Sequence, residues 1–221
     1  MSKMNMIAAL NSALRHQLAR DENIVIFGED IGYFGGVFRV TAKLQEEFGA
    51  HRVFDSPLAE GGIAAIAMGM GLNGLRPVAE IQFADYIFPA YDQIVNEIAN
   101  LRHRSGGEFS TPVTIRTPAG GGIKGGHHHS QSPESQFTHT PGLKVVYCSN
   151  PNNAKGLLTS AIECNDPVIF FEPKRCYRGP FYGDPHNVPT WSGHPEAEVP
   201  DSHYKIPLGV ARLAMEGDRC T

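Results

Sequence analysis

The amino-acid sequence predicts an α/β protein with a mostly parallel sheet and helices on both faces. Short apolar segments bounded by Gly, Pro, Asn or Asp alternate along the chain with longer segments of helical periodicity. Parallel strands need crossover connections of that length, and the connecting helices cover the two faces of the sheet. Ligands of such folds bind beyond the carboxyl ends of the strands. The candidate binding loops are therefore 28–40, 55–61, 82–86 and 117–141.

The chain before Asp21 has the pattern of an amphipathic helix. Ile7, Leu10, Leu14 and Leu18 form one apolar stripe at helical spacing. The same stretch contains basic residues but no acidic ones, and in this it weakly resembles a transit peptide. A structural helix is the preferred interpretation, because the stretch leads directly into a strand-like segment.

Strand and helix patterns then alternate to about residue 171. The predicted strands span 24–27, 52–54, 78–83, 113–116, 144–148 and 168–171. The predicted helices span 41–48, 60–72, 85–104 and 150–163. Asn150 and Pro151 supply the cap and first turn of the last of these helices.

The organisation changes after residue 175. We expect 1–175 to form one α/β domain, 176–205 to form a Pro- and Gly-rich excursion or linker, and 206–221 to begin a C-terminal domain. The excursion contains several aromatic residues, which favours an ordered segment because free linkers are poor in aromatics. A strand-like run resumes at Ile206.

Charge and cysteine content exclude several classes of protein. The net charge is −4 and the pI is near 6.2, with basic residues scattered, so there is no electrostatic footprint for nucleic acid or an anionic membrane. No apolar run reaches the roughly 18 residues that a membrane span needs. The 4 cysteines lack C-x-x-C spacing, which favours reduced thiols in a cytosol.

Glu60 is a carboxylate that opens an apolar, small-residue helix. Removing a carboxylate from water raises its pKa unless a partner stabilises the charge, so such a group can hold or share a proton near neutral pH. A lone glutamate at this position is also explained by the dipole of the helix N-terminus. The residue alone leaves both interpretations open.

Two glycine-rich motifs do not predict nucleotide sites. GMGLNG at 69–74 ends a helix and does not follow a strand, so it lacks the context of a dinucleotide site. The run at 120–126 has no Gly-Lys-Ser/Thr and is not a Walker loop. Its glycines allow the backbone to change conformation or to approach a ligand closely.

Three consecutive histidines, at 127–129, suggest either metal binding or proton transfer. Neighbouring side chains of an extended segment alternate in direction, so the three imidazoles cannot all face one ion. A histidine beside a reacting carbonyl is a plausible acid or base, because it titrates near neutrality.

Six short motifs occur in the same order as in a known family. They are GED at 28–30, FGGVFR at 34–39, DSPLAE at 55–60, EIQFADY at 80–86, HSQSPE at 129–134 and FFEPK at 170–174. Together they resemble the β subunits of thiamin-diphosphate-dependent 2-oxo acid dehydrogenases. The last two motifs resemble the branched-chain (2-oxoisovalerate) members more than the pyruvate members. The resemblance covers residues 5 to about 175 and implies a transketolase-like pyrimidine-binding domain.

The resemblance implies two catalytic residues. Glu60 matches the acid that shares a proton with N1′ of the cofactor's pyrimidine, so that the cofactor's own 4′-imino group can remove the thiazolium C2 proton. His129 matches the histidine that transfers protons during decarboxylation or acyl transfer to lipoamide. The roles of His127 and His128 stay open.

The resemblance also implies a set of cofactor-binding residues around Glu60. Leu58 matches the apolar contact that helps to keep thiamin diphosphate bent, and Tyr86 matches the aromatic neighbour of the pyrimidine. Gln82 and Glu29 match its polar surroundings.

Further cofactors and partners follow from the same resemblance. The family's alpha subunit holds the diphosphate and its Mg²⁺ with a Gly-Asp-Gly motif that this sequence lacks, so this chain would carry half of a site. A second beta subunit and the lipoyl acyltransferase core would be the other partners. The segments around 113–114 and 161–166 match a region that can hold a monovalent cation through backbone carbonyls.

The activity implied for an alpha/beta heterotetramer is oxidative decarboxylation of 3-methyl-2-oxobutanoate and related 2-oxo acids, with reductive acylation of lipoamide. This step of branched-chain amino acid catabolism would take place in a bacterial cytoplasm, or in the mitochondrial matrix of a eukaryote. Pyruvate or acetoin as substrate, a truncated non-catalytic partner of the alpha subunit, and a His-cluster metal-binding protein remain as alternatives.

Family members continue into a C-terminal domain that supports dimerisation and docking on the core, and we expect this chain to lack it. We therefore expect Ile206, Leu208, Val210 and Leu213 to lack apolar partners and the chain to self-associate.

Overall fold

A six-stranded parallel sheet forms the centre of the molecule. The computed structural model describes residues 1–178, 197–213 and 215–218. The strand order is β3-β2-β4-β5-β7-β6, and every neighbouring pair is parallel. The strands are β2 (Ile24–Gly28), β3 (Val53–Asp55), β4 (Arg76–Glu80), β5 (Thr114–Ala119), β6 (Lys144–Tyr147) and β7 (Val168–Pro173). The predicted fold class is confirmed, and each of the six predicted strands is present.

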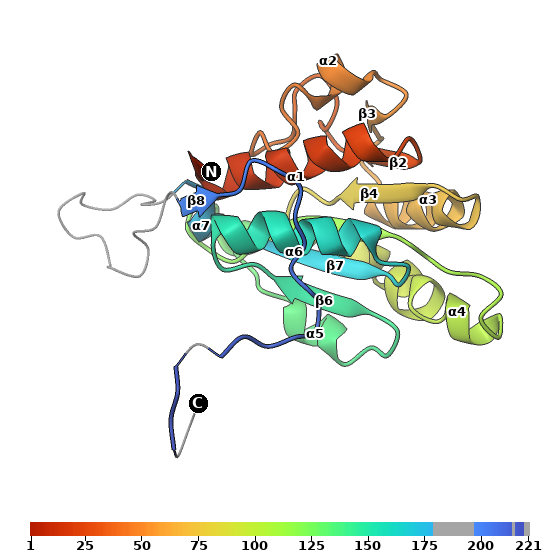
Figure 1. Cartoon of the computed structure of the whole chain (residues 1–221). Coiled ribbons are helices and arrows are strands. Elements are labelled where there is room, and N and C mark those ends of the chain that lie inside the picture. The colour runs from red at the N-terminus through yellow and green to blue at the C-terminus, as the bar shows by residue number, and fades with distance from the viewer. Residues whose placement is uncertain (179–196, 214, 219–221) are drawn as a thin grey trace.

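Helices cover both faces of this sheet and create two apolar cores. Helices α1 (Met6–Arg20) and α6 (Pro151–Glu163) lie side by side on one face (Figure 1). Helix α3 (Glu60–Leu72) covers the other face. Successive residues of a strand contribute to opposite cores, because their side chains point alternately to the two faces of the sheet. Ile26 contributes to the core under α1 and α6, whereas Phe27 contributes to the core under α3.

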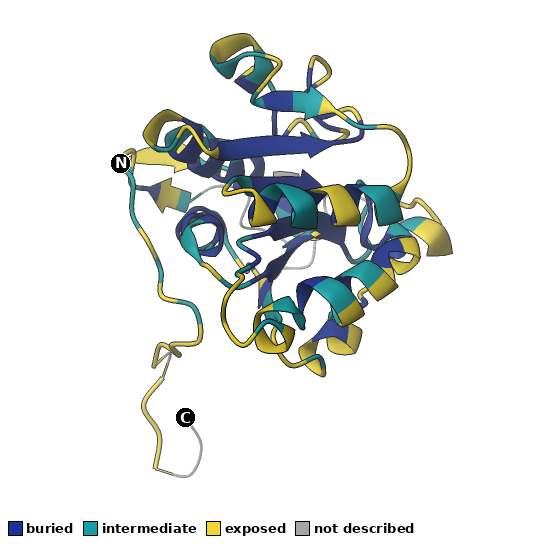
Figure 2. Ribbon diagram, turned by 90° about the vertical axis from the view of Figure 1, so that its right-hand side faces the viewer, coloured by how far each residue is buried: buried dark blue, intermediate teal, exposed yellow. Residues whose placement is uncertain are grey.

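The strands are buried on both sides, which explains why their sequences are continuously apolar. Figure 2 shows them as buried ribbons between partly exposed helices. All five residues of β2 are buried, as expected for a parallel strand with helices on both faces. The last position of this strand requires a glycine, because a Cβ on Gly28 would lie 2.5 Å from the backbone oxygen of Glu80 on β4.

Two predicted helices differ from the structure. The helix expected over 41–48 begins only at Leu44, as α2 (Leu44–Phe48). The continuous helix expected over 85–104 is broken into η1 (Ala84–Tyr86), η2 (Phe88–Ala90), the π-helix η3 (Gln93–Ile98) and α4 (Leu101–Arg104). Pro89 lacks the N–H that a regular helix would use here, and Ala99 N–H donates to Ile94 O across a π turn at 3.0 Å.

Several short elements were not predicted. Strand β1 (Ser2–Met4) pairs antiparallel with β8 (Ala197–Val199), which fixes the N-terminus beside the segment that begins at 197. The other unpredicted elements are η4 (His127–His129), α5 (Glu134–Thr138) and α7 (Lys174–Arg178). Most of the excursion expected at 176–205, namely 179–196, lies outside the described residues, as does Cys220.

The expected strand at 206–208 is absent, and this segment packs instead on α6. Ile206 N–H donates to Gly156 O at 3.1 Å, and Ser160 Oγ donates to Ile206 O at 2.6 Å. A Cβ at Gly156 would lie within 2.6 Å of the Ile206 side chain, so the glycine permits this approach. Ile206 and Leu208 are half-buried, which contradicts the expectation that they lack partners.

The chain beyond this contact leaves the body of the molecule (Figure 1). Val210 and Leu213 are 67% and 58% exposed, as expected for these two residues. Among the described residues, no helix is both long and apolar enough to cross a membrane.

Candidate functional site

Loops that follow four parallel strands bring most of the candidate residues to one edge of the sheet. Glu29 follows β2, and Leu58 follows β3 on the way to α3. Gln82 and Tyr86 follow β4, and His129 lies in the long loop after β5. This is the edge at which ligands of parallel α/β folds bind.

His129 is held by two aromatic side chains. Its Nε2 lies 2.9 Å from the hydroxyl of Tyr86. Its ring meets the ring of Phe83 edge to face, with centroids 4.5 Å apart. The imidazole is therefore fixed on one side, while its residue stays partly accessible to solvent. A histidine in this state can give or take a proton at a bound molecule.

Asp85 fixes the loop that carries His129. Its carboxylate is buried, and Oδ1 accepts hydrogen bonds from the backbone N–H groups of Ser130 at 3.1 Å and Gln131 at 3.2 Å. Among the residues that the structure describes, none donates a hydrogen bond to Oδ2. No role for Asp85 was predicted from the sequence, although an acid between the apolar residues of the motif EIQFADY was a signal of a buried polar contact.

Lys174 is a fully buried cation beneath the same site. Its Nζ lies 5.4 Å from the centre of the Phe83 ring and donates to Pro118 O at 3.4 Å. Burial lowers the pKa of Lys174 to about 8, and the negative charge of Asp85 opposes part of that shift. Phe83 thus contacts both a buried ammonium and the His129 imidazole.

The Glu60 carboxylate contributes to a raised pKa of Glu29. Glu29 is 9% exposed, and burial raises its pKa, with smaller contributions from the charges of Glu60 and Asp30. Glu60 is the first residue of α3 and is half-buried. Gln82 Nε2 donates to Asp30 Oδ2 at 2.9 Å, so the loops after β2 and β4 are joined here.

Leu58 is the exposed member of the predicted set. Its side chain is 78% exposed, on the loop between β3 and α3, two residues before Glu60. This loop therefore presents an exposed apolar side chain two residues before a half-buried carboxylate.

A buried network of ion pairs joins the neighbouring strands β4, β5 and β7 of the sheet. The Arg116 guanidinium donates to Glu172 at 2.7 and 2.9 Å and to Glu80 Oε2 at 2.6 Å. The Tyr177 hydroxyl donates to Glu172 Oε2 at 2.5 Å. Burial raises the pKa of Glu80, although the charge of Arg116 opposes the shift. The sequence showed Glu80 and Glu172 within family motifs, but nothing in their spacing indicated a shared arginine.

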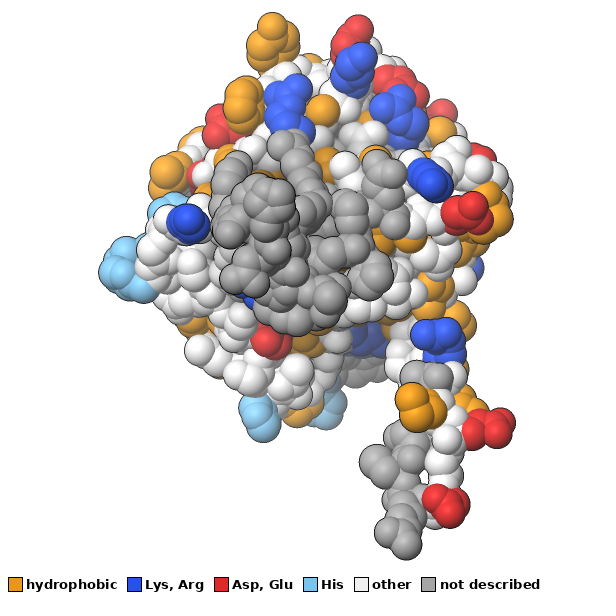
Figure 3. Space-filling model, turned by 90° about the vertical axis from the view of Figure 1, so that its left-hand side faces the viewer, with side chains coloured by type: hydrophobic (Ala, Val, Ile, Leu, Met, Phe, Trp, Pro, Cys, Tyr) orange, Lys and Arg blue, Asp and Glu red, His pale blue; other side chains and the backbone are white. Residues whose placement is uncertain are grey.

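His127 and His128 are placed differently from His129. Both are exposed, and their rings lie 3.7 Å apart. Within residues 1–178, 197–213 and 215–218, no three His, Cys, Asp or Glu side chains are grouped as metal ligands would be. Histidines stand at the periphery of the face shown in Figure 3, on which basic and acidic side chains are interspersed.

Comparison with known proteins identifies the family. Residues 2–180 match the family model described as "Transketolase, pyrimidine binding domain". The chain is 55% identical to the 2-oxoisovalerate dehydrogenase subunit beta of Pseudomonas aeruginosa, with 100% of this chain and 63% of that protein aligned. It is 46% identical to the pyruvate dehydrogenase E1 component subunit beta of Acholeplasma laidlawii, again over 100% and 63%. The chain therefore spans less than two thirds of the length of these relatives.

A solved structure supports the fold. A split-gene transketolase described as an inactive beta4 tetramer superimposes with a TM-score of 0.61 at 19% identity, over 76% of this chain and 51% of that one. Both relatives reported above are beta subunits of 2-oxo acid dehydrogenases, which confirms the resemblance of the six motifs. The protein belongs to the family of transketolase pyrimidine-binding domains.

Proposed function

We propose that this chain is the pyrimidine-binding part of the beta subunit of a branched-chain 2-oxo acid dehydrogenase, with residues 1–175 as its α/β domain. The observation that carries the proposal is the convergence of the predicted residues at one edge of the sheet. There Tyr86 contacts His129, and the Glu60 carboxylate acts on Glu29. The 55% identity to the Pseudomonas aeruginosa beta subunit supports the same substrate class.

The residues at this edge fit thiamin diphosphate. An aminopyrimidine needs a carboxyl group that can share a proton with its ring nitrogen, and Glu60 supplies one at the accessible start of α3. The raised pKa of Glu29 favours the protonated form of that carboxyl group, which lies in the same site. The exposed Leu58 side chain provides an apolar surface for the cofactor.

We assign the cofactor contacts of this chain accordingly. Glu60 would bind the pyrimidine nitrogen through a shared proton, and Leu58 would pack against the cofactor. Tyr86 would lie beside the pyrimidine ring, with Gln82 and Glu29 forming its polar surroundings. When bound, thiamin diphosphate supplies a carbon nucleophile for decarboxylation of a 2-oxo acid.

His129 is the proposed proton-transfer residue. Its Nε2 contacts the Tyr86 hydroxyl, and exchange of that partner for a substrate or lipoamide atom would allow proton transfer there. Asp85 keeps the loop in place through two backbone N–H groups, so His129 does not have to be ordered at each turnover.

Partners would complete the site. An alpha subunit would hold the diphosphate and Mg²⁺, since this sequence contains no Gly-Asp-Gly motif. A second beta subunit and a lipoyl acyltransferase core are the other proposed partners. Bacterial and mitochondrial proteins are both among the relatives, so we propose the bacterial cytoplasm or the mitochondrial matrix as the location. A pyruvate-specific complex is the second candidate, supported by the 46% identity to the Acholeplasma laidlawii protein.

Co-expression with an alpha subunit tests the proposal. The purified complex is expected to release CO₂ from 3-methyl-2-oxobutanoate faster than from pyruvate and to acylate lipoamide. Glu60→Gln should lower turnover by roughly 10² or more, within the range for a positioned acid–base group. Glu22→Gln, an exposed glutamate outside the site, should leave turnover unchanged. Near-full activity of Glu60→Gln would remove Glu60 from the mechanism.

A further inference from the structure

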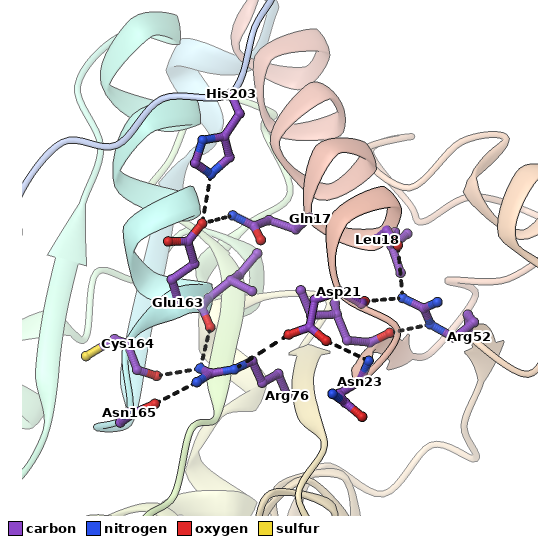
Figure 4. Close-up of polar contacts among 12 residues, drawn as sticks. Gln17, Leu18, Asp21, Asn23, Arg52, Arg76, Glu163, Cys164, Asn165 and His203 are labelled. Carbon is purple, nitrogen blue, oxygen red and sulfur yellow. Dashed lines mark hydrogen bonds and ion pairs between the residues drawn. The ribbon is translucent and has the colours of Figure 1, made fainter.

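We infer that Arg76 takes the place of a bound monovalent cation at the C-terminal end of α6. Arg76 is the first residue of β4, and its guanidinium lies against the last turn of that helix (Figure 4). Nη1 donates to the backbone oxygens of Ile162 at 3.1 Å and Cys164 at 3.2 Å. Nη2 donates to the side-chain oxygen of Asn165 at 2.6 Å.

The end of a helix is a place where positive charge stabilises the fold. The last backbone oxygens of a helix have no partner within the helix, and the helix dipole concentrates negative charge there. Ile162 lies in the last turn of α6, and Cys164 is its C-cap. A bound ion or a guanidinium can satisfy these oxygens, and in this chain they already have the guanidinium.

Four further oxygens of the two segments suggested for a cation also have donors. Val113 O accepts from Val168 N–H at 2.9 Å, and Ala161 O accepts from Cys164 N–H at 3.2 Å. The two carboxylate oxygens of Asp166 are paired separately, one with Arg102 and one with Lys144.

The side-chain cations of Arg76, Arg102, Lys144 and Lys205 therefore already contact the segment 161–166. A monovalent cation that bound the same oxygens as Arg76 would be repelled by its guanidinium. The oxygens present here do not fit such an ion. The role that the ion would have is performed by Arg76, which joins the start of β4 to the end of α6.

The backbone and an acidic side chain keep Arg76 in this position. Its N–H donates to Asn23 O at 2.8 Å, and its Nε lies 3.8 Å from Asp21 Oδ2. Arg52 forms a similar contact at the end of α1, where Nη2 donates to Leu18 O at 3.2 Å and to Asp21 O at 2.8 Å. Arg52 lies outside the two segments suggested for a cation, so it provides a matched control.

Thermal unfolding of the purified chain tests the inference, and the test does not depend on catalysis. Midpoints are compared in KCl, NaCl and choline chloride at equal ionic strength. The wild-type midpoint should be the same in all three salts within about 1 °C, because no ion binds preferentially to the folded state. A rise of several degrees in KCl over choline chloride would overturn the inference.

Two variants sharpen the result. Arg76→Met should unfold several degrees lower, and KCl, but not choline chloride, should restore part of the loss because the vacated oxygens can then bind the ion. Arg52→Met should also unfold earlier, but equally in each salt. A potassium response of Arg52→Met equal to that of Arg76→Met, or none in Arg76→Met, would contradict the assignment.

A third variant is used if Arg76→Met does not fold. Arg76→Lys keeps the charge, so its unfolding midpoint should be independent of the salt, as in the wild type. A higher midpoint of Arg76→Lys in KCl than in choline chloride would again overturn the inference.

Discussion

The hydroxyl of Tyr86 lies 2.9 Å from Nε2 of His129, although 43 positions separate the two residues in the sequence. One follows β4 and the other lies in the glycine-rich loop after β5. Their contact fixes one nitrogen of the histidine that we propose for proton transfer.

This contact predicts different effects for two neighbouring histidines. In the complex with an alpha subunit, His129→Ala should slow decarboxylation or lipoamide acylation by roughly 10² or more, because a positioned acid–base group is lost. His127→Ala is the matched control, since His127 is exposed and its ring contact is with His128. Single-turnover and steady-state rates of both variants measure the difference. Equal, small losses would remove His129 from the proposed chemistry.

The buried arginine predicts a large effect on stability. Arg116→Met leaves the carboxyl groups of Glu80 and Glu172 buried without their cation, which should lower the free energy of unfolding by about 3–5 kcal/mol. Arg104→Met removes an exposed pair with Glu97 at 2.8 Å and should cost no more than about 1 kcal/mol. Urea unfolding of both variants makes the comparison. A loss for Arg116→Met as small as that for Arg104→Met would show that the network does not stabilise the fold.

Lys174 predicts a pH dependence of stability. The folded protein releases the Lys174 proton near pH 8, whereas the unfolded chain keeps it to about pH 10.5. The unfolded state therefore binds more protons between these two values, so this lysine makes stability rise with pH in that window.

Comparison with Lys174→Met isolates that contribution. From pH 8 to pH 10.5 the free energy of unfolding of the wild type should rise relative to that of the variant, and below pH 8 the difference should be constant. Urea unfolding at steps of pH measures both. A difference that stays constant across the whole range would mean that the buried lysine keeps an ordinary pKa.

Much of the fold was predictable because the strands are buried on both faces. A strand such as β2, in which all five residues are buried, has a continuous apolar sequence that identifies it without knowledge of its partners. The pairing of Lys3 with Glu198 was not predictable in this way, because two three-residue strands far apart in the sequence have no local pattern. The π turn before Ala99 was not predicted for another reason. The apolar stripe of this segment has the spacing of an ordinary helix, so the sequence does not distinguish the two.

The candidate site was predictable only where a motif identified its residues. Glu60 and His129 belong to recognisable motifs, whereas the contacts of Asp85 and Lys174 depend on how loops from different strands meet. The packing of the C-terminal segment 206–213 could not be predicted from the sequence for the same reason. The sequence around Ile206 gave no indication that Gly156 leaves room for its side chain on α6.

The contact of the tail with α6 predicts an order of proteolysis. Lys205 pairs with Glu163 at 3.0 Å, whereas Arg212 is exposed beyond the contact. Limited trypsin digestion should therefore cut after Arg212 before it cuts after Lys205, as read by mass spectrometry. Glu163→Gln weakens the pair and should bring the two cuts closer in time. Initial cleavage after Lys205 in the wild type would show that the tail does not stay on α6.

Titration calorimetry with thiamin diphosphate and Mg²⁺ tests the central proposal most directly. The isolated chain should bind the cofactor weakly or not at all, because we propose that the alpha subunit holds the diphosphate and Mg²⁺. Addition of an alpha subunit should produce binding at least about tenfold tighter than that of either subunit alone, or about 1.4 kcal/mol. Tight binding by the isolated chain, or no gain on mixing, would contradict a cofactor site that is shared between two subunits.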